Sequence, residues 1–111
     1  MSSVANTTFD CADPVTLATF WAGVFEYDGE ISSDEASAWF PEPGGDGRRG
    51  LLFLVVPEAK TAKNRVHWDV TVADLSALLD AGATLLRSKD SEIRWHILAD
   101  PEGNEFCAFD A

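Results

Sequence analysis

The chain has 111 residues, of which 46% are hydrophobic and 11% aromatic, which suffices for one hydrophobic core and is too apolar for a disordered segment. Eight Lys and Arg residues against 19 Asp and Glu residues give a formal net charge of -11, which opposes binding to nucleic acid and to anionic membrane surfaces. No segment approaches the ~20 consecutive apolar residues of a membrane span. Residues 1–8 lack the features of a secretory signal, so we expect a cytoplasmic protein.

The chain begins with a predicted strand and a predicted helix. Residues 7–11 alternate in polarity, and apolar residues then recur at helical spacing from Leu17 to Phe25. Asp13 is a favourable N-cap, and Pro14 suits the first helical position because its missing amide proton would have had no partner there. The pattern therefore predicts a strand followed by a helix.

The rest of the first half predicts short strands and a long loop. Turn residues in 27–40 leave room only for short strands, and residues 41–49, with three glycines and two prolines, predict an exposed loop. Residues 51–56 form a continuous apolar run, which is typical of a strand buried on both faces. Residues 57–64 are polar without a period, so we interpret them as a linker.

The second half repeats this order. Residues 66–72 alternate, which predicts a strand with one core face formed by Val66, Trp68, Val70 and Val72. A helix capped by Asp74 should end at Gly82. Strands are predicted at 84–87 and 93–99. The chain then makes a tight turn at 100–103 and ends in a strand at 104–109.

The two halves match each other in sequence pattern. A shift of 61 positions places residues 66–74 on residues 5–13, and a shift of 53 places residues 103–107 on residues 50–54. The loop at 41–49 can absorb the difference. The repeat predicts two units, each with a strand, a helix and further strands, that bend their sheet around a shared cavity.

Three segments resemble the glyoxalase-like branch of the vicinal oxygen chelate superfamily, to which bleomycin-resistance proteins and dioxygenases also belong. They are residues 9–14 followed by Phe20-Trp21, residues 56–67, and residues 100–107. Their order and spacing extend the match over nearly the whole chain. The resemblance implies one α+β domain over residues 1–111, made of tandem βαβββ units at about 4–57 and 65–111. Their curved mixed sheet would surround a cavity, with the helices outside, and two chains would pair as a homodimer.

In metal-dependent members of that superfamily, the ligands lie near the start of each unit's first strand and on its last strand. The resemblance places these positions at Asn6 and Leu54 in the first unit and at His67 and Cys107 in the second. Only His67 is a usual ligand type, whereas an ion needs three or four donors. We therefore expect no cofactor; if a divalent metal does bind, we expect His67 and Glu105 to hold it.

We expect a small-molecule ligand, aromatic or cationic, on the curved sheet near His67, Glu105 and Cys107. We predict that the binding residues lie on the sheet face that lines the cavity. They are Asn6, Trp39, Leu54, His67, Asp69, Trp95, Glu105 and Cys107. For His67 the alternative is a wall imidazole bonded to Asp69 or Glu105. For Trp39 and Trp95, cavity wall and core are equally compatible with the sequence.

The two cysteines are predicted to be free thiols. Cys11 should pack towards the helix, and Cys107 is more compatible with an inert buried thiol than with a nucleophile, because no activating cation lies nearby in the sequence. Trp21 and Trp68 are predicted core residues.

Three functions remain open at this point. The first is a binding domain with a degenerate or absent metal site. The second is an enzyme, a lyase, isomerase or dioxygenase, that acts on an oxygenated small molecule through His67 and Glu105 as catalytic residues. The third is an interaction domain without a usable cavity. The sequence also leaves open whether the basic segment 60–65 contacts a substrate or only solvent.

Overall fold

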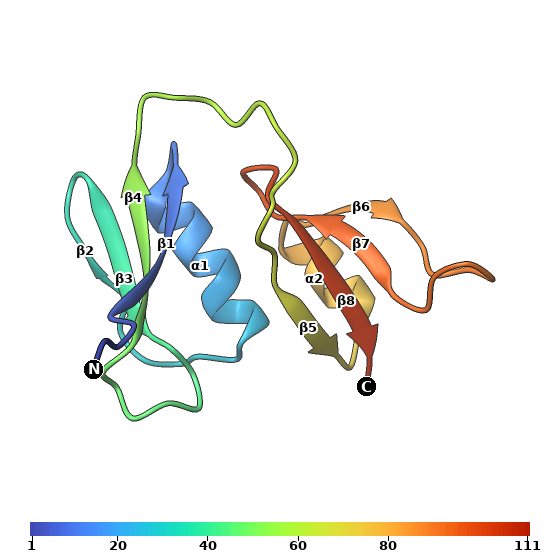
Figure 1. Ribbon diagram of the computed structural model, residues 1–111, viewed down its shortest axis with the longest axis horizontal. Coiled ribbons are helices and arrows are strands. Elements are labelled where there is room, and N and C mark those ends of the chain that lie inside the picture. Colours follow the sequence, from blue (N-terminus) through green and yellow to red (C-terminus); the bar gives the residue numbers. More distant parts are fainter. The chain divides into compact units, whose positions relative to one another are not determined.

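A computed structural model describes residues 1–111. The chain divides into two compact units, Met1–Ala59 and Lys60–Ala111. Each unit contains one helix and one four-stranded mixed sheet (Figure 1). The predicted α+β fold of two tandem βαβββ units is confirmed, and the two sheets are not closed.

In the first unit, the first and last strands are neighbours and run parallel, whereas the other pairs are antiparallel. The strand order is β1-β4-β3-β2. The elements in chain order are β1 (Asn6–Cys11), α1 (Pro14–Val24), β2 (Ser32–Ser33), β3 (Ser37–Pro41) and β4 (Gly50–Val55).

The helix α1 begins as the sequence predicts and covers one face of this sheet. The Asp13 carboxylate accepts a hydrogen bond from the Thr16 amide at 3.2 Å, which satisfies one of the unpaired N–H groups of the first turn. Phe9 stacks on Phe53 with 4.9 Å between ring centroids and lies 5.8 Å from Trp21. Such pairs contribute about 0.5–1.5 kcal/mol beyond their burial, so aromatic packing joins α1 to β1 and β4.

The second unit has the same strand order as the first. Its sheet runs β5-β8-β7-β6, with β5 parallel to β8 and the other pairs antiparallel. The elements are β5 (Asp69–Val72), α2 (Leu75–Ala81), β6 (Thr84–Arg87), β7 (His96–Ala99) and β8 (Glu105–Asp110). The internal repeat inferred from the sequence is therefore a repeat of topology.

The helix cap and the tight turn of the second unit also form where the sequence predicts them. The Asp74 carboxylate accepts a hydrogen bond from the Ser76 amide at 3.0 Å, and α2 ends at Gly82. In the turn before β8, the buried Asp100 carboxylate accepts hydrogen bonds from the Glu102 and Asn104 amides, at 2.9 and 3.0 Å. Gly103 closes this turn with a positive φ of 86°, a conformation that glycine adopts without strain.

The structure corrects three strand predictions. The strand at 51–56 is not buried on both faces, because Leu54 is 38% and Val55 42% exposed. The strand predicted from Val66 begins at Asp69, and Val66 is 88% exposed rather than in the core. The strand predicted at 93–99 begins only at His96, because the preceding residues form a loop built around Asp90.

The structure also corrects the alignment of the last strands of the two units. Cys11 pairs with Val55 and Val72 pairs with Asp110, so a shift of 61 on the first strand goes with a shift of 55, not 53, on the last strand. The glycine match was misleading, because Gly50 lies inside β4 whereas Gly103 lies in the turn before β8. The structural equivalent of Cys107 is therefore Leu52, and that of Leu54 is Phe109.

Core packing follows the alternation of the strands. In the first unit Ala38, Phe40, Leu51 and Phe53 are buried, and in the second unit Leu98, Phe106 and Ala108. Burying a Phe or Leu side chain contributes about 1.5–3 kcal/mol, so these residues stabilise the helix-covered face of each sheet. Neither helix combines the length and the apolar composition that a membrane crossing requires.

Candidate functional site

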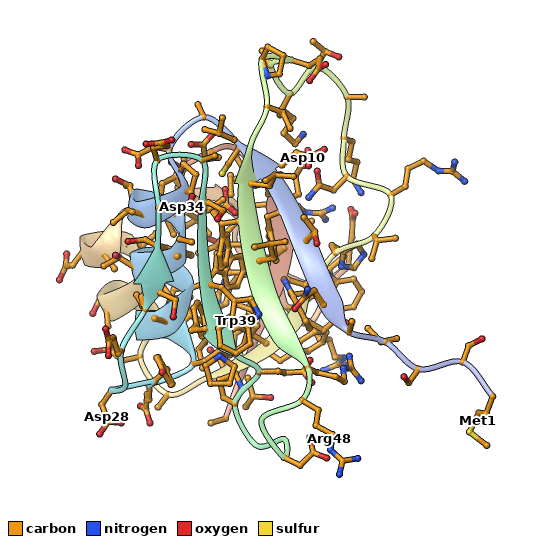
Figure 2. All side chains as sticks on the ribbon, turned by 90° about the vertical axis from the view of Figure 1, so that its left-hand side faces the viewer. Met1, Asp10, Asp28, Asp34, Trp39 and Arg48 are labelled. Atoms are coloured by element: carbon orange, nitrogen blue, oxygen red, sulfur yellow. The ribbon has the colours of Figure 1, made fainter.

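Each sheet has one face that its own helix does not cover, which we call the open face. On the first sheet the register places Asn6 beside Gly50, then Thr8 beside Leu52 and Trp39, then Asp10 beside Leu54. Figure 2 looks onto the first unit from this side, with Trp39 towards one end of the sheet and Asp10 at the other end of β1. Of the predicted binding residues, Asn6, Trp39 and Leu54 share this face.

The indole of Trp39 is held in one orientation on the open face. Its Nε1–H donates a hydrogen bond to the Asn6 Oδ1 at 2.9 Å, across the intervening strand β4. The crossing point is Gly50, where an added Cβ would overlap the indole ring. Trp39 is half-buried, and its ring can occupy the space over Gly50 only because Gly50 has no side chain.

Leucine side chains lie on the strand next to this ring, and one acidic side chain shares its face. Leu52 is half-buried and Leu54 is 38% exposed, on the strand next to Trp39. Asp10 is an exposed side chain of β1, one row further along the same face, and the structure shows no ion pair for its carboxylate. The face therefore combines an aromatic plane, two leucines and an uncompensated negative charge, a set that suits a planar cation.

The second unit brings three predicted residues together at the start of β5. The His67 Nδ1 lies 3.3 Å from the Asp69 Oδ1, and Asp69 pairs in register with Cys107 on β8. One potential ligand atom from each of the three residues lies within 4.8 Å of the others. His67 and Cys107 were predicted at this position from the sequence, and Asp69 was predicted as a binding residue and as an alternative hydrogen-bond partner of His67.

The Cys107 thiol is not activated in this cluster. Desolvation by burial raises its pKa, and the nearby Asp69 carboxylate raises it further. A thiol attacks as the thiolate, so a raised pKa lowers its reactivity at neutral pH. The geometry therefore favours a hydrogen-bonded group of His67, Asp69 and Cys107 over a cysteine nucleophile.

Glu105 is held by the segment that precedes β5. Its carboxylate lies 2.9 Å from the Lys60 Nζ and accepts a hydrogen bond from the Asn64 amide at 3.1 Å. The hydrogen bond from Lys60 is the main cause that lowers the pKa of Glu105 to about 2, with a further contribution from Asn64. Glu105 is therefore ionised at neutral pH and already paired. The basic segment contacts the sheet through Lys60.

Trp95 lies beside the beginning of β7 and packs against Phe109 on β8. Their ring centroids are 5.7 Å apart, with the planes tilted by 35°. Both rings are half-buried. This places Trp95 on the open side of the second sheet, together with Cys107 and Phe109, and opposite the buried Phe106 and Ala108.

These residues do not match the four-ligand metal site that the resemblance implies. The Asn6 side-chain oxygen accepts the indole hydrogen bond, and Leu54 has no donor atom. In the second unit, His67, Asp69 and Cys107 offer three donors of types that zinc accepts. This set differs from the pair of His67 and Glu105 that was expected from the sequence as metal ligands. The Glu105 carboxylate is instead paired with Lys60.

Sequence reasoning missed several residues that shape these faces. Gly50 is part of the Trp39 platform, and only the strand register reveals the contact. Lys60 neutralises Glu105 from 45 positions earlier in the chain. The buried His96 also went unassigned; its Nδ1 accepts a hydrogen bond from the Lys89 amide at 3.1 Å. No local sequence pattern signals such long-range partners.

Comparison with known families finds one match. A model described as the glyoxalase-like domain matches residues 6–109. No curated protein sequence matches the chain.

Solved structures with the same fold come from several bacteria. A glyoxalase/bleomycin resistance protein/dioxygenase family enzyme from Burkholderia phytofirmans PsJN is 16% identical, with 98% of each chain covered and a TM-score of 0.71. A glyoxalase-related enzyme from Fulvimarina pelagi is 17% identical, covering 100% of this chain and 89% of that one, with a TM-score of 0.69. A possible glyoxalase from Bacillus cereus is 15% identical, with 98% and 99% covered and a TM-score of 0.67. At such identities the likeness concerns the fold.

The Trp39 platform makes a prediction about Gly50. In Gly50→Ala the new methyl group overlaps the indole, so we expect a loss of about 1–3 kcal/mol in the free energy of unfolding and a broken Trp39–Asn6 hydrogen bond. Urea unfolding and the NMR signal of the indole N–H measure both. Gly23→Ala is the control: nothing lies within 4 Å of its Cβ, and alanine stabilises a helix by about 0.5–1 kcal/mol. Equal stability of Gly50→Ala and wild type would contradict the platform.

The ion pair of Glu105 predicts a pH-dependent stability. Because the folded pKa is lowered from 4.5 to about 2, the carboxylate stabilises the fold above pH 4.5, and this contribution is lost as the pH falls towards 2. We expect Glu105→Gln to lower the free energy of unfolding by about 1–2 kcal/mol at pH 7, and the difference from wild type to vanish near pH 2. Glu35→Gln, at an exposed glutamate without an ion pair, is the charge-matched control. A difference that is independent of pH would contradict the assignment.

Proposed function

Because the chain belongs to the glyoxalase-like domain family of the vicinal oxygen chelate superfamily, we propose that it binds a small molecule, and that the open face of its first sheet takes a planar cationic ligand without a metal. The observation that carries the proposal is the fixed Trp39 indole, which Asn6 holds over Gly50. A ring that is already oriented loses little conformational entropy when a flat ligand stacks on it.

The charge of the face selects the sign of the ligand. Asp10 lies on the same face and has no cationic partner in the structure, and the whole chain carries a formal charge of -11. A cation over an aromatic ring gains about 0.5–2 kcal/mol, more as the site is desolvated. Leu52 and Leu54 extend the apolar surface beside the ring. An anionic ligand would be repelled here.

A dye-binding experiment tests this function. Proflavine, a planar tricyclic cation, should bind with one saturable site in the presence of EDTA, as measured by calorimetry. We expect Trp39→Leu to weaken binding by about tenfold, which corresponds to ~1.4 kcal/mol. Trp39→Phe, which keeps an aromatic plane but loses the bond to Asn6, should weaken it less.

Charge-matched variants separate specific binding from general attraction to an acidic protein. Asp10→Asn should weaken proflavine binding several-fold, whereas Glu35→Gln, which removes the same charge from an exposed turn, should leave it unchanged. The effect of Asp10→Asn should be smaller at high salt because this charge is exposed. If Trp39→Leu binds like wild type, or if Asp10→Asn and Glu35→Gln behave alike, the proposed site is wrong.

A second candidate function, metal-dependent chemistry, is favoured by the cluster of His67, Asp69 and Cys107. Three such donors could hold a divalent ion with one position open for an oxygenated substrate. A bound ion would supply Lewis-acid polarisation. The chain's own contribution would be His67 oriented by Asp69 at 3.3 Å.

Metal analysis distinguishes the two functions. Under the metal-free proposal, we expect the purified chain to contain far less than one equivalent of zinc, and Co²⁺ titration to give no sulfur-to-cobalt absorption band. Stoichiometric metal that is lost in His67→Ala and Asp69→Asn would instead support the second candidate. Asp80→Asn, at an exposed position of α2, is the charge-matched control for Asp69→Asn.

A further inference from the structure

A pocket of the second unit lies where β7 begins and β8 ends. It is lined by Lys89, Asp90, Arg94, Phe109 and Asp110, and its volume is about 500 Å³. Sites for small ligands typically have ~300–1,000 Å³. Three of the lining residues come from the segment between β6 and β7, and two from the end of β8.

Hydrogen bonds hold this segment in place. The Asp90 Oδ1 accepts from the Glu92 amide at 2.7 Å and from the Ile93 amide at 3.0 Å, which folds the loop upon itself. The Lys89 amide donates to the His96 Nδ1 at 3.1 Å, which attaches the loop to β7. Lys89 Nζ also pairs with Asp110, which attaches it to β8. The pocket wall is therefore organised without a ligand.

The charges around the pocket leave one cation uncompensated. Asp90 pairs with Arg87 at 3.1 Å, and Asp110 pairs with Lys89 and lies 3.6 Å from the His96 Nε2. Both carboxylates are already satisfied by donors. The structure shows no ion pair or hydrogen bond for the Arg94 guanidinium. In this acidic chain the pocket thus presents a free guanidinium to solvent.

An aromatic wall stands beside that cation. The Phe109 ring lines the pocket, and Trp95 packs on Phe109 with 5.7 Å between the ring centroids. A guanidinium binds a carboxylate through two parallel N–H···O hydrogen bonds, and a flat ring can pack on Phe109. A ligand that satisfies both walls is flat, aromatic and carries a carboxylate.

We propose that the pocket formed by Lys89, Asp90, Arg94, Phe109 and Asp110 is a second ligand site, which takes planar aromatic carboxylates. The ligand carboxylate accepts from Arg94, and its ring lies against Phe109. The site selects an anion, whereas the Trp39 face selects a cation, so the two sites respond to different compounds. A cationic ligand has no free carboxylate here, because Asp90 and Asp110 have their own partners.

The test uses 2-naphthoate as the probe and NMR signals as the readout. Titration of the full chain should shift the Arg94 Nε–H and the Trp95 indole N–H in a saturable way. The neutral analogue 2-naphthamide should bind about tenfold more weakly, because a charge-assisted pair is lost. Raising the salt concentration should weaken naphthoate but not the amide.

Matched variants assign the effect to the pocket. Arg94→Gln should reduce naphthoate affinity about tenfold, and Phe109→Leu should reduce the affinity for both compounds. Arg65→Gln removes an equal charge from an exposed residue of the same unit that does not line the pocket, and it should bind like wild type. Arg94→Gln that binds like wild type would overturn the proposal, as would shifts that do not saturate or tighter binding of 2-naphthylmethylammonium. None of these outcomes bears on proflavine binding at Trp39, so the two proposals can fail separately.

Discussion

The first and last strands of each unit pair in parallel, and the register of this pairing determines which side chains meet on the open faces. In the first unit it sets Asn6 beside Gly50, so the Trp39 indole can cross the glycine and reach the amide oxygen. In the second unit the same pairing sets Asp69 beside Cys107. A slip by one residue would turn each of these side chains towards the helix. Both candidate sites therefore depend on a backbone ladder rather than on any single contact.

The two units use equivalent positions differently. The parallel register makes Gly50 of β4 the counterpart of Glu105 of β8. In the first unit the missing side chain provides a floor for an aromatic ring, whereas in the second unit a carboxylate fixes the segment before β5 through Lys60 and Asn64. The first unit thus has an indole that is held in place on its open face. In the second unit the Glu105 carboxylate is already paired with Lys60 and Asn64. This asymmetry is the structural reason for placing the cation-binding function on the first unit.

Most of the fold could be predicted from two features of the sequence, the alternation of apolar and polar residues in strands and the capping residues of helices. Three kinds of feature follow from residues that are close together in the sequence. They are the strand at 104–109, the caps at Asp13 and Asp74, and the turn at 100–103. Val66 was misplaced because alternation continues into residues that have no strand partner. The site was predicted less completely, since Trp39 with Asn6, and Glu105 with Lys60, are contacts between distant residues whose geometry depends on the register. Cys107 lies on the face of β8 opposite the buried Phe106 and Ala108, and its counterpart in the first unit is Leu52 and not Leu54.

The parallel ladder also has a consequence for the order in which the first unit forms. Pro41 of β3 pairs with Gly50 across one connecting loop, whereas α1 and the strands β2 and β3 lie in the chain between Asn6 of β1 and the same glycine. Closing a longer loop costs more chain entropy, and non-local pairs form more slowly than local ones. In a chain that has formed only the β3–β4 hairpin, Trp39 therefore has no acceptor in place, because Asn6 has not yet docked. The Trp39–Asn6 hydrogen bond forms only when the amino-terminal strand docks, so the proposed ligand site requires the fully folded first unit.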